Sequence, residues 1–131
     1  MSALNLNKKE VHIKIHKEIL SKLEENIYKI FQYFILNKEV LMEHKKELLN
    51  VWERVSIHRL LEESENGPYH RVLKDQRFEG LQGLKRYHEL LESFIVEMKT
   101  IQDDFKFVIK NLAALELFKK HIELEESILF S

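Results

Sequence analysis

The sequence predicts an all-α protein built as an up-down-up-down antiparallel four-helix bundle. Apolar residues recur every three or four positions in four long stretches, which is the period of one face of an α-helix. Only three glycines and one proline interrupt the 131 residues. The clearest turn signals fall between the four stretches, so short links are expected to join neighbouring helices. This length is typical of one domain with one core, and we expect residues 1–131 to form a single domain.

The first helix is expected to run from about Lys8 to Leu36. Its inward face carries the following residues: His16, Leu20, Leu23, Ile27, Ile30 and Phe34. Asn37 is the best turn residue before the second helix. The second helix shows the same period in another set: Leu41, His44, Leu48, Val51, Val55, His58 and Glu62. Asn66-Gly67-Pro68 must end it, because proline lacks an N–H and its ring clashes with the preceding helical turn.

A mixed segment follows this break, with a short helical piece expected from Arg71 to Phe78. The third long helix is marked by the following residues: Leu81, Leu84, His88, Leu91, Ile95 and Met98. Asp103-Asp104 is the expected turn before the fourth helix. That helix is marked by Ala114, Leu117, His121, Leu124, Glu125 and Ile128. The aromatic residues expected mainly in the core are Phe31, Phe34, Phe94, Phe105, Phe107 and Phe118, with Tyr28, Tyr33 and Tyr87.

Composition excludes several classes of function. Lys and Arg number 21 against 22 Asp and Glu, and this balance lacks the basic footprint of a nucleic-acid-binding protein. No apolar run approaches the roughly 20 residues that a membrane span needs, and the first residues lack a signal-peptide core. We therefore expect no nucleic-acid partner, no membrane partner and a cytoplasmic location. The absence of cysteine removes disulfides, thiolate metal sites and cysteine nucleophiles.

Two histidine–glutamate pairs carry the chemical signal. His58 and Glu62, and likewise His121 and Glu125, are four residues apart, so each pair lies on one face of its helix. Each pair offers an imidazole nitrogen and a carboxylate to a common point. Two facing helices of this kind can hold two metal ions with the carboxylates bridging them.

The positions of the histidines indicate that they meet. Asn37, a predicted turn, lies midway between His16 and His58. The midpoint of His88 and His121 likewise falls beside the predicted turn at 103–104. At a rise of about 1.5 Å per residue, antiparallel helices would therefore bring all four histidines into one layer.

A single pair of this spacing is most often an ordinary surface ion pair. Two pairs on apolar faces, in register with two more histidines, favour metal binding, because ionisable residues are rarely buried without partners or metal. The candidate ligands are His16, His58, Glu62, His88, His121 and Glu125. Glu92 and His12 are further candidates, although a solvent-edge position for Glu92 and a packing role for His12 are preferred. Glu63, Glu123 and Glu126 are expected either in solvent or orienting the imidazoles.

The motifs resemble those of the hemerythrin-like family, also called the HHE cation-binding domain. The segment from His121 to Phe130 is similar to its fourth-helix signature, H-x-x-x-E-E-x-x-L-F. The segment from Ile57 to Pro68 resembles the second-helix signature, with Asn66-Gly67 in place of Leu-Phe. His16-Lys-Glu-Ile-Leu and Tyr87-His88-Glu-Leu-Leu resemble the first-helix and third-helix patterns. One departure is Glu92, where hemerythrins place a second third-helix histidine.

The resemblance implies a non-haem centre of two iron ions, bridged by oxide or hydroxide, inside a four-helix bundle. It implies a protein that binds or senses O2, with peroxide or NO as related small ligands. Two other functions stay open: a di-iron oxidase, peroxidase, iron-storage or nitrosative-stress enzyme, and a metal-free helical interaction module. Histidine and carboxylate without thiolate also suit Mn or Zn, so iron is preferred through the resemblance alone. The pattern identifies no catalytic residue and no protein partner.

Overall fold

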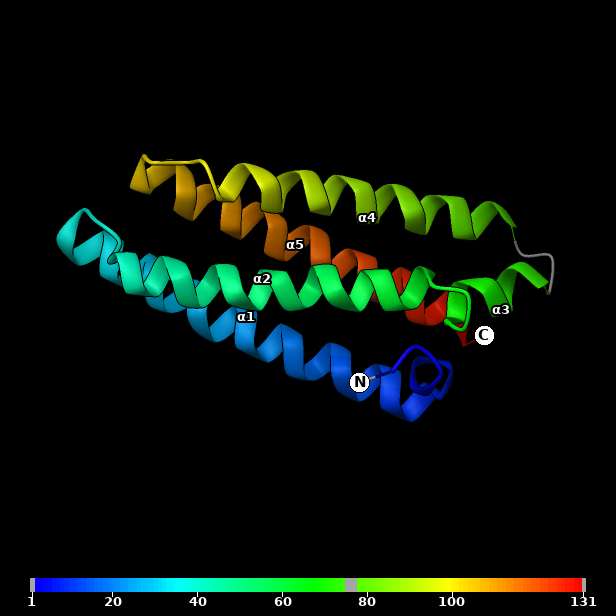
Figure 1. Ribbon diagram of the computed structural model, residues 1–131. Helices are drawn as coiled ribbons and strands as arrows, with labels where there is room; N and C mark the ends of the chain where they lie inside the picture. Colours follow the sequence, from blue (N-terminus) through cyan, green and yellow to red (C-terminus); the bar gives the residue numbers. More distant parts are fainter. Residues whose placement is uncertain (1, 75–77, 131) are drawn as a thin grey trace.

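The computed structural model describes residues 2–74 and 78–130, and within these ranges the chain forms helices and no strands. A short 3-10 helix, η1 (Asn5–Asn7), precedes α1 (Lys9–Asn37) and α2 (Met42–Glu63). A seven-residue helix, α3 (Pro68–Lys74), is followed by α4 (Phe78–Met98) and α5 (Asp104–Leu129). Figure 1 shows the four long helices side by side, with α3 and both chain ends near the same end of the bundle. The prediction of an all-helical bundle is confirmed for the described residues.

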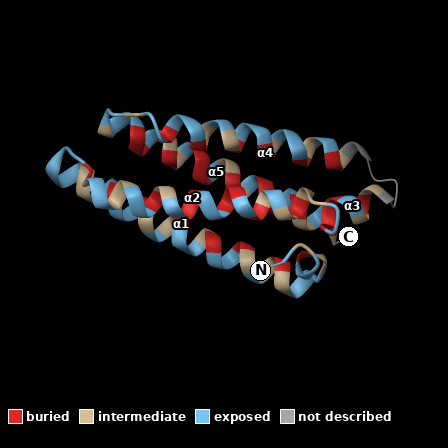
Figure 2. Cartoon of the chain, viewed as in Figure 1, coloured by how far each residue is buried: buried red, intermediate tan, exposed pale blue. Residues whose placement is uncertain are grey.

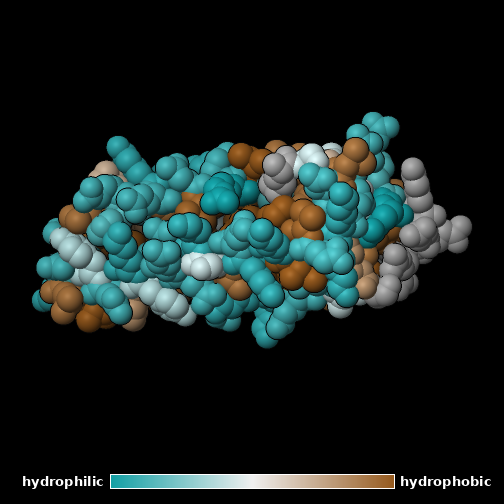
Figure 3. All heavy atoms as spheres, turned by 90° about the horizontal axis from the view of Figure 1, so that it is seen from below, coloured by the Kyte–Doolittle hydropathy of each residue, from teal (hydrophilic) through white to brown (hydrophobic). Residues whose placement is uncertain are grey.

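Each long helix packs against two others. α1 contacts α2 and α5, while α4 contacts α5 and α2. Buried residues face the space between the helices (Figure 2), whereas the face drawn in Figure 3 is largely hydrophilic with smaller hydrophobic areas. None of the helices in the described part of the chain has the length and hydropathy needed to cross a bilayer.

The long helices end close to where the sequence predicts. α1 continues through Asn37, and the turn begins at Lys38, whose φ of 59° is left-handed. The Lys38 N–H donates to the carbonyl of Phe34 at 2.7 Å and satisfies an otherwise open carbonyl. At the start of α5, the carboxylate of Asp103 accepts a hydrogen bond from the backbone N–H of Lys106 at 2.9 Å. This is the usual way to satisfy a free amide at a helix N-terminus.

The chain packs closely against the end of α2 where it turns, more closely than the sequence predicts. Only glycine fits at Gly67, because a Cβ there would lie 2.6 Å from the carbonyl oxygen of Glu62 and would also clash with that of Leu61. Pro68 then occupies the first position of α3, where its missing N–H costs nothing. The short helix therefore begins three residues before the predicted piece at 71–78, and residues 75–77 of that piece lie outside the described residues.

The apolar core forms two clusters. The larger one extends along most of the bundle; its buried members include Ile19, Leu23, Trp52, Val55, Leu91, Ile95 and Phe118. The smaller one lies at the α3 end and consists of Tyr69, Val72, Leu81, Leu84 and Leu129. On each long helix the predicted metal ligands fall next to the larger cluster, on the side toward the α3 end. They therefore form a polar layer that separates the two clusters.

Three aromatic residues predicted in the core are exposed, so the prediction was wrong for them: Tyr28, Phe31 and Phe105. Phe31 follows the buried Ile30 and is rotated about 100° from it around α1, which takes it off the buried face. Phe105 lies in the first turn of α5, where its ring contacts Phe34 at a centroid distance of 6.0 Å. Aromatic type alone did not distinguish these rings from the core.

Candidate metal centre

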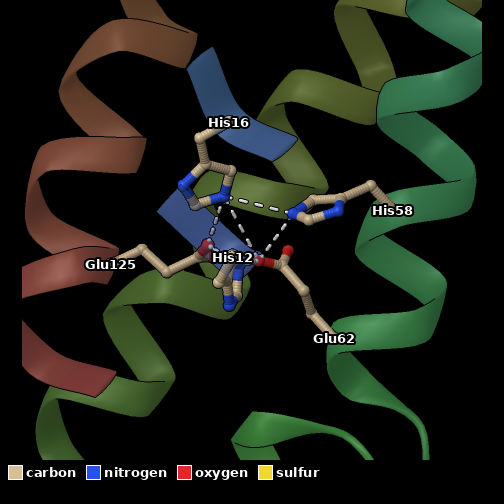
Figure 4. Close-up of side chains that lie close together, drawn as sticks. All are labelled: His12, His16, His58, Glu62 and Glu125. Carbon is tan, nitrogen blue, oxygen red and sulfur yellow. Dashed lines mark hydrogen bonds and ion pairs between the residues drawn. The ribbon is translucent and has the colours of Figure 1, made fainter. Parts of the chain in front are cut away.

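The polar layer contains seven side chains, each no more than about 3% exposed: His12, His16, His58, Glu62, His88, His121 and Glu125. All four long helices contribute. α1 carries two histidines and α4 carries one, while α2 and α5 each carry one histidine and one glutamate. Figure 4 shows five of these side chains pointing toward one another from α1, α2 and α5. The structure thus brings together the six preferred candidates. It also adds His12, for which the sequence favoured a packing role.

The seven side chains form two overlapping groups of metal-binding atoms. His12, His16 and His58 join both carboxylates in the first group. His88 and His121 join the same two carboxylates in the second. Within each group the nitrogen and oxygen atoms all lie within 4.8 Å of one another. Glu62 and Glu125 are the residues that the two groups share.

The shared carboxylates present a different oxygen to each group. Oε2 of Glu62 lies 3.0 Å from Nε2 of His58, whereas its Oε1 lies 3.3 Å from Nε2 of His88. Oε1 of Glu125 lies 2.9 Å from Nε2 of His16, and its Oε2 lies 2.9 Å from Nε2 of His121. A carboxylate that divides its oxygens in this way can serve two neighbouring metal positions.

Two local observations fit metal ions at this place. First, Oε1 of Glu125 is buried and accepts no hydrogen bond of good geometry, although Nε2 of His16 is within hydrogen-bonding distance. Second, Nε2 of His16 and Nε2 of His58 are 3.1 Å apart. Two ligands held at a right angle, each about 2.1 Å from one ion, would be about 3.0 Å apart. Nitrogen and oxygen ligands without sulfur suit Fe, Mn or Zn.

The outer nitrogens of three imidazoles are held by neighbouring groups. Nδ1 of His12 lies 2.8 Å from the carbonyl oxygen of Leu6, just before α1. Nδ1 of His16 lies 3.2 Å from Glu126, and Nδ1 of His88 lies 3.1 Å from Glu63. These contacts direct Nε2 of each ring toward the centre. Of the two roles expected for Glu63 and Glu126, the structure therefore supports orientation of the imidazoles, while Glu123 is exposed.

Glu92 belongs to neither group. Its Oε2 accepts a hydrogen bond from Ser56 at 2.8 Å and lies 3.8 Å from Nε of Arg59, with about a third of the side chain exposed. Glu92 instead lines one edge of a cavity that reaches His58 and His121. The open volume of this cavity is only ≈ 10 Å³, which is about enough for one water molecule.

Tyr69 was not predicted from the sequence; it is 1% exposed and reaches the centre from α3. Its hydroxyl donates a hydrogen bond to Oε2 of Glu125 at 2.6 Å and lies 3.1 Å from Nε2 of His88. Burial raises the pKa of Tyr69 above its ordinary value, and the carboxylates of Glu125 and Glu62 raise it further. No periodic signal points to Tyr69, because the helical pattern stops at Pro68, one residue earlier.

Carboxylates and imidazoles also control each other's protonation. Burial by itself lowers the pKa of His12, but hydrogen bonding to Glu125 and Glu62 outweighs burial and raises the pKa to about 9. The same balance raises the pKa of His88 to about 11. Burial would raise the pKa of Glu125, yet its hydrogen bonds, those from the histidines included, hold the pKa well below its usual range. Without metal, the imidazoles of His12, His16 and His88 are therefore protonated beside the ionised carboxylates of Glu62 and Glu125.

This protonation predicts how the stability of the metal-free protein depends on pH. The pKa of His12 rises from 6.5 to about 9 on folding, so its contribution is complete below pH 6.5 and is lost as the pH rises through 9. The contribution of His88 to stability is lost in the same way as the pH rises through about 11. Urea unfolding of chelator-treated protein between pH 6 and 10 is expected to show a falling free energy of unfolding. A value that stays constant or rises across this range would contradict the assignment.

Comparisons of this chain with protein-family models, with characterised proteins and with solved structures find no significant match.

Proposed function

We propose that this protein is a hemerythrin-like di-iron protein that binds or senses O2, or a related small oxidant, inside an up-down-up-down bundle. One observation carries the proposal: two buried groups of histidines share the same two carboxylates, and each carboxylate turns a different oxygen to each group. Mn and Zn remain alternatives to iron, because the same atoms can bind them. Two iron ions, when bound, would supply the electrons for chemistry with O2.

The residues of the chain then have distinct roles. When metal is bound, the histidines of the first group would hold one ion, and His88 and His121 would hold the other. Glu62 and Glu125 would serve both positions and offset part of the positive charge. Outer partners such as Glu63 and Glu126 keep the imidazoles turned inward.

The size of the cavity supports a small ligand. Val55, Leu91, Ile95 and Phe118 line it together with the histidines. Its size suits a molecule of a few atoms and excludes a larger organic substrate. The apolar part of this lining limits the access of bulk water to the centre.

Iron binding tests the proposal directly. Metal-free protein is expected to take up two Fe(II) ions per chain under anaerobic conditions, as measured by elemental analysis after gel filtration. Addition of O2 is then expected to change the visible spectrum, and removal of O2 should reverse the change if the protein is a carrier or sensor. Absence of Fe(II) uptake would exclude the di-iron function.

The polar edge of the cavity favours an enzyme as the second candidate. Ser56, Arg59 and Glu92 form a hydrogen-bonded and ionic set beside the centre, and such groups can deliver protons to an oxidant that is being reduced. A di-iron oxidase or peroxidase would consume O2 or peroxide over many cycles when supplied with a reductant. Oxygen-electrode measurements separate this activity from reversible binding. A nitrosative-stress role would show as consumption of NO, and an iron-storage role as uptake of more than two ions.

A further inference from the structure

The two groups of the centre differ in their number of protein ligands. The first group offers three imidazole nitrogens and two carboxylate oxygens, and the second offers two of each. The hydroxyl of Tyr69 lies on the side of the second group, next to His88 and to the Oε2 atom that Glu125 turns toward His121. The second group thus has one candidate ligand atom fewer than the first, and the hydroxyl oxygen of Tyr69 lies beside it.

The distance from this oxygen to His88 matches the distances between the candidate ligands themselves. The Tyr69 hydroxyl is 2.6 Å from Oε2 of Glu125 and 3.1 Å from Nε2 of His88. Within the two groups, the histidine–carboxylate pairs on α2 and α5 are separated by 3.0 and 2.9 Å. Ligands about 2.1 Å from one ion and at right angles to each other are about 3.0 Å apart. The hydroxyl is therefore spaced like a ligand of the same ion.

The sequence around Tyr69 fixes this position. Gly67 permits the close turn beneath the last residues of α2, and Pro68 starts α3 directly afterwards. The Tyr69 ring stacks on that of His88, with a centroid distance of 5.2 Å and an angle of 10° between the planes. Arg71 in α3 donates hydrogen bonds to the backbone carbonyls of Asn7 and Leu129 at 3.0 and 2.7 Å. A mobile surface tyrosine would have none of these restraints.

We propose that Tyr69 is a ligand of the ion held by His88 and His121. This inference rests on the proposed di-metal function and adds a phenolate to its ligand set. Binding forms a bond between the metal ion and the phenolic oxygen and breaks the O–H bond, and the proton leaves to solvent. The two positions then become chemically unequal, with three imidazoles at one and two imidazoles plus an anionic oxygen at the other. The hard phenolate stabilises the ferric state at its own position.

The experiment is spectroscopic and does not depend on activity. Wild-type protein, Tyr69→Phe and Tyr87→Phe are loaded with iron and oxidised, and the iron content of each is measured. The Tyr87 ring packs on His121 at a centroid distance of 5.7 Å, which makes Tyr87→Phe the matched control. Wild type and Tyr87→Phe should show visible phenolate-to-iron(III) absorption and tyrosinate bands in resonance Raman spectra excited within it. Tyr69→Phe should lose both while retaining iron at the first position.

The outcomes separate the inference from the proposed function. Two bound iron ions without tyrosinate bands in wild type would overturn Tyr69 ligation and leave the di-iron proposal standing. Failure of wild type to bind metal would overturn both. A titration of wild-type protein with Zn²⁺ gives a second measurement that needs no variant, because ligation produces the ultraviolet difference spectrum of an ionised tyrosine. Zn²⁺ binding without that difference spectrum would also overturn the inference.

Discussion

Replacing Glu62 by alanine is expected to remove metal from both positions. Glu62 is 1% exposed, and its two oxygens face different groups of histidines. The substitution would therefore remove one ligand from each ion at once, and it removes one of the two buried carboxylates that face the protonated imidazoles. Loss of one member of a buried, charged network typically costs about 3–5 kcal/mol of folding stability. Elemental analysis of purified protein measures the loss of metal, and urea unfolding measures the loss of stability.

Glu63→Ala is the matched control, because it changes the neighbouring residue on the same helix. Glu63 contacts the outer nitrogen of His88, so its loss should weaken orientation of one imidazole and leave both bridging carboxylates in place. Removal of such an outer partner typically lowers metal affinity about 10–100-fold. At saturating metal the Glu63→Ala protein should still hold two ions. Equal depletion of metal in the two variants would show that the bridging role belongs elsewhere on α2.

Removal of metal from the wild-type protein is expected to lower the melting temperature by about 10–20 °C. Binding to the folded state alone adds about 4 kcal/mol when free metal exceeds Kd a thousandfold. For a domain of this size, each kcal/mol corresponds to a few degrees. The stripped protein should nevertheless remain folded at room temperature, because the larger apolar cluster extends well away from the centre.

Thermal unfolding followed by circular dichroism, with and without a chelator, measures this difference. Readdition of metal should restore the original melting curve, which separates metal loss from irreversible damage. Identical curves for stripped and loaded protein would indicate an accidental site at the surface rather than a centre inside the bundle.

The helices could be predicted from the sequence because their buried faces repeat with the period of an α-helix. Helical periodicity also predicted that Glu62 and Glu125 lie beside their histidines, since four residues make about one helical turn. It gave Glu92 the same spacing from His88, but α4 continues its buried face through Leu91 and Ile95. Glu92 is rotated off that face and meets Ser56. A four-residue spacing therefore places both residues on the buried face only when each of them also continues that helix's series of buried residues.

Two parts of the site needed the three-dimensional structure. His12 precedes His16 by one turn, so a signal was present, but only the position of η1 shows how its outer nitrogen is held by Leu6. Tyr69 follows the break at Pro68, and the direction of the chain after such a turn depends on packing between distant segments. The contacts of Arg71 with Asn7 and Leu129 are of this kind, and nothing in local sequence spacing encodes them.

The division of the apolar core into two unequal clusters bears on how quickly metal ions would exchange at the centre. The small cluster around Val72 and Leu84 lies on one side of the centre, and the large cluster lies on the other. Because fewer buried side chains hold the small one, that end can open at a lower free energy than the whole molecule. The lifetime of an ion held in the centre would then be set by partial opening at α3 rather than by global unfolding. Native-state hydrogen exchange should accordingly show less protected amides in α3 than in the middle of α5.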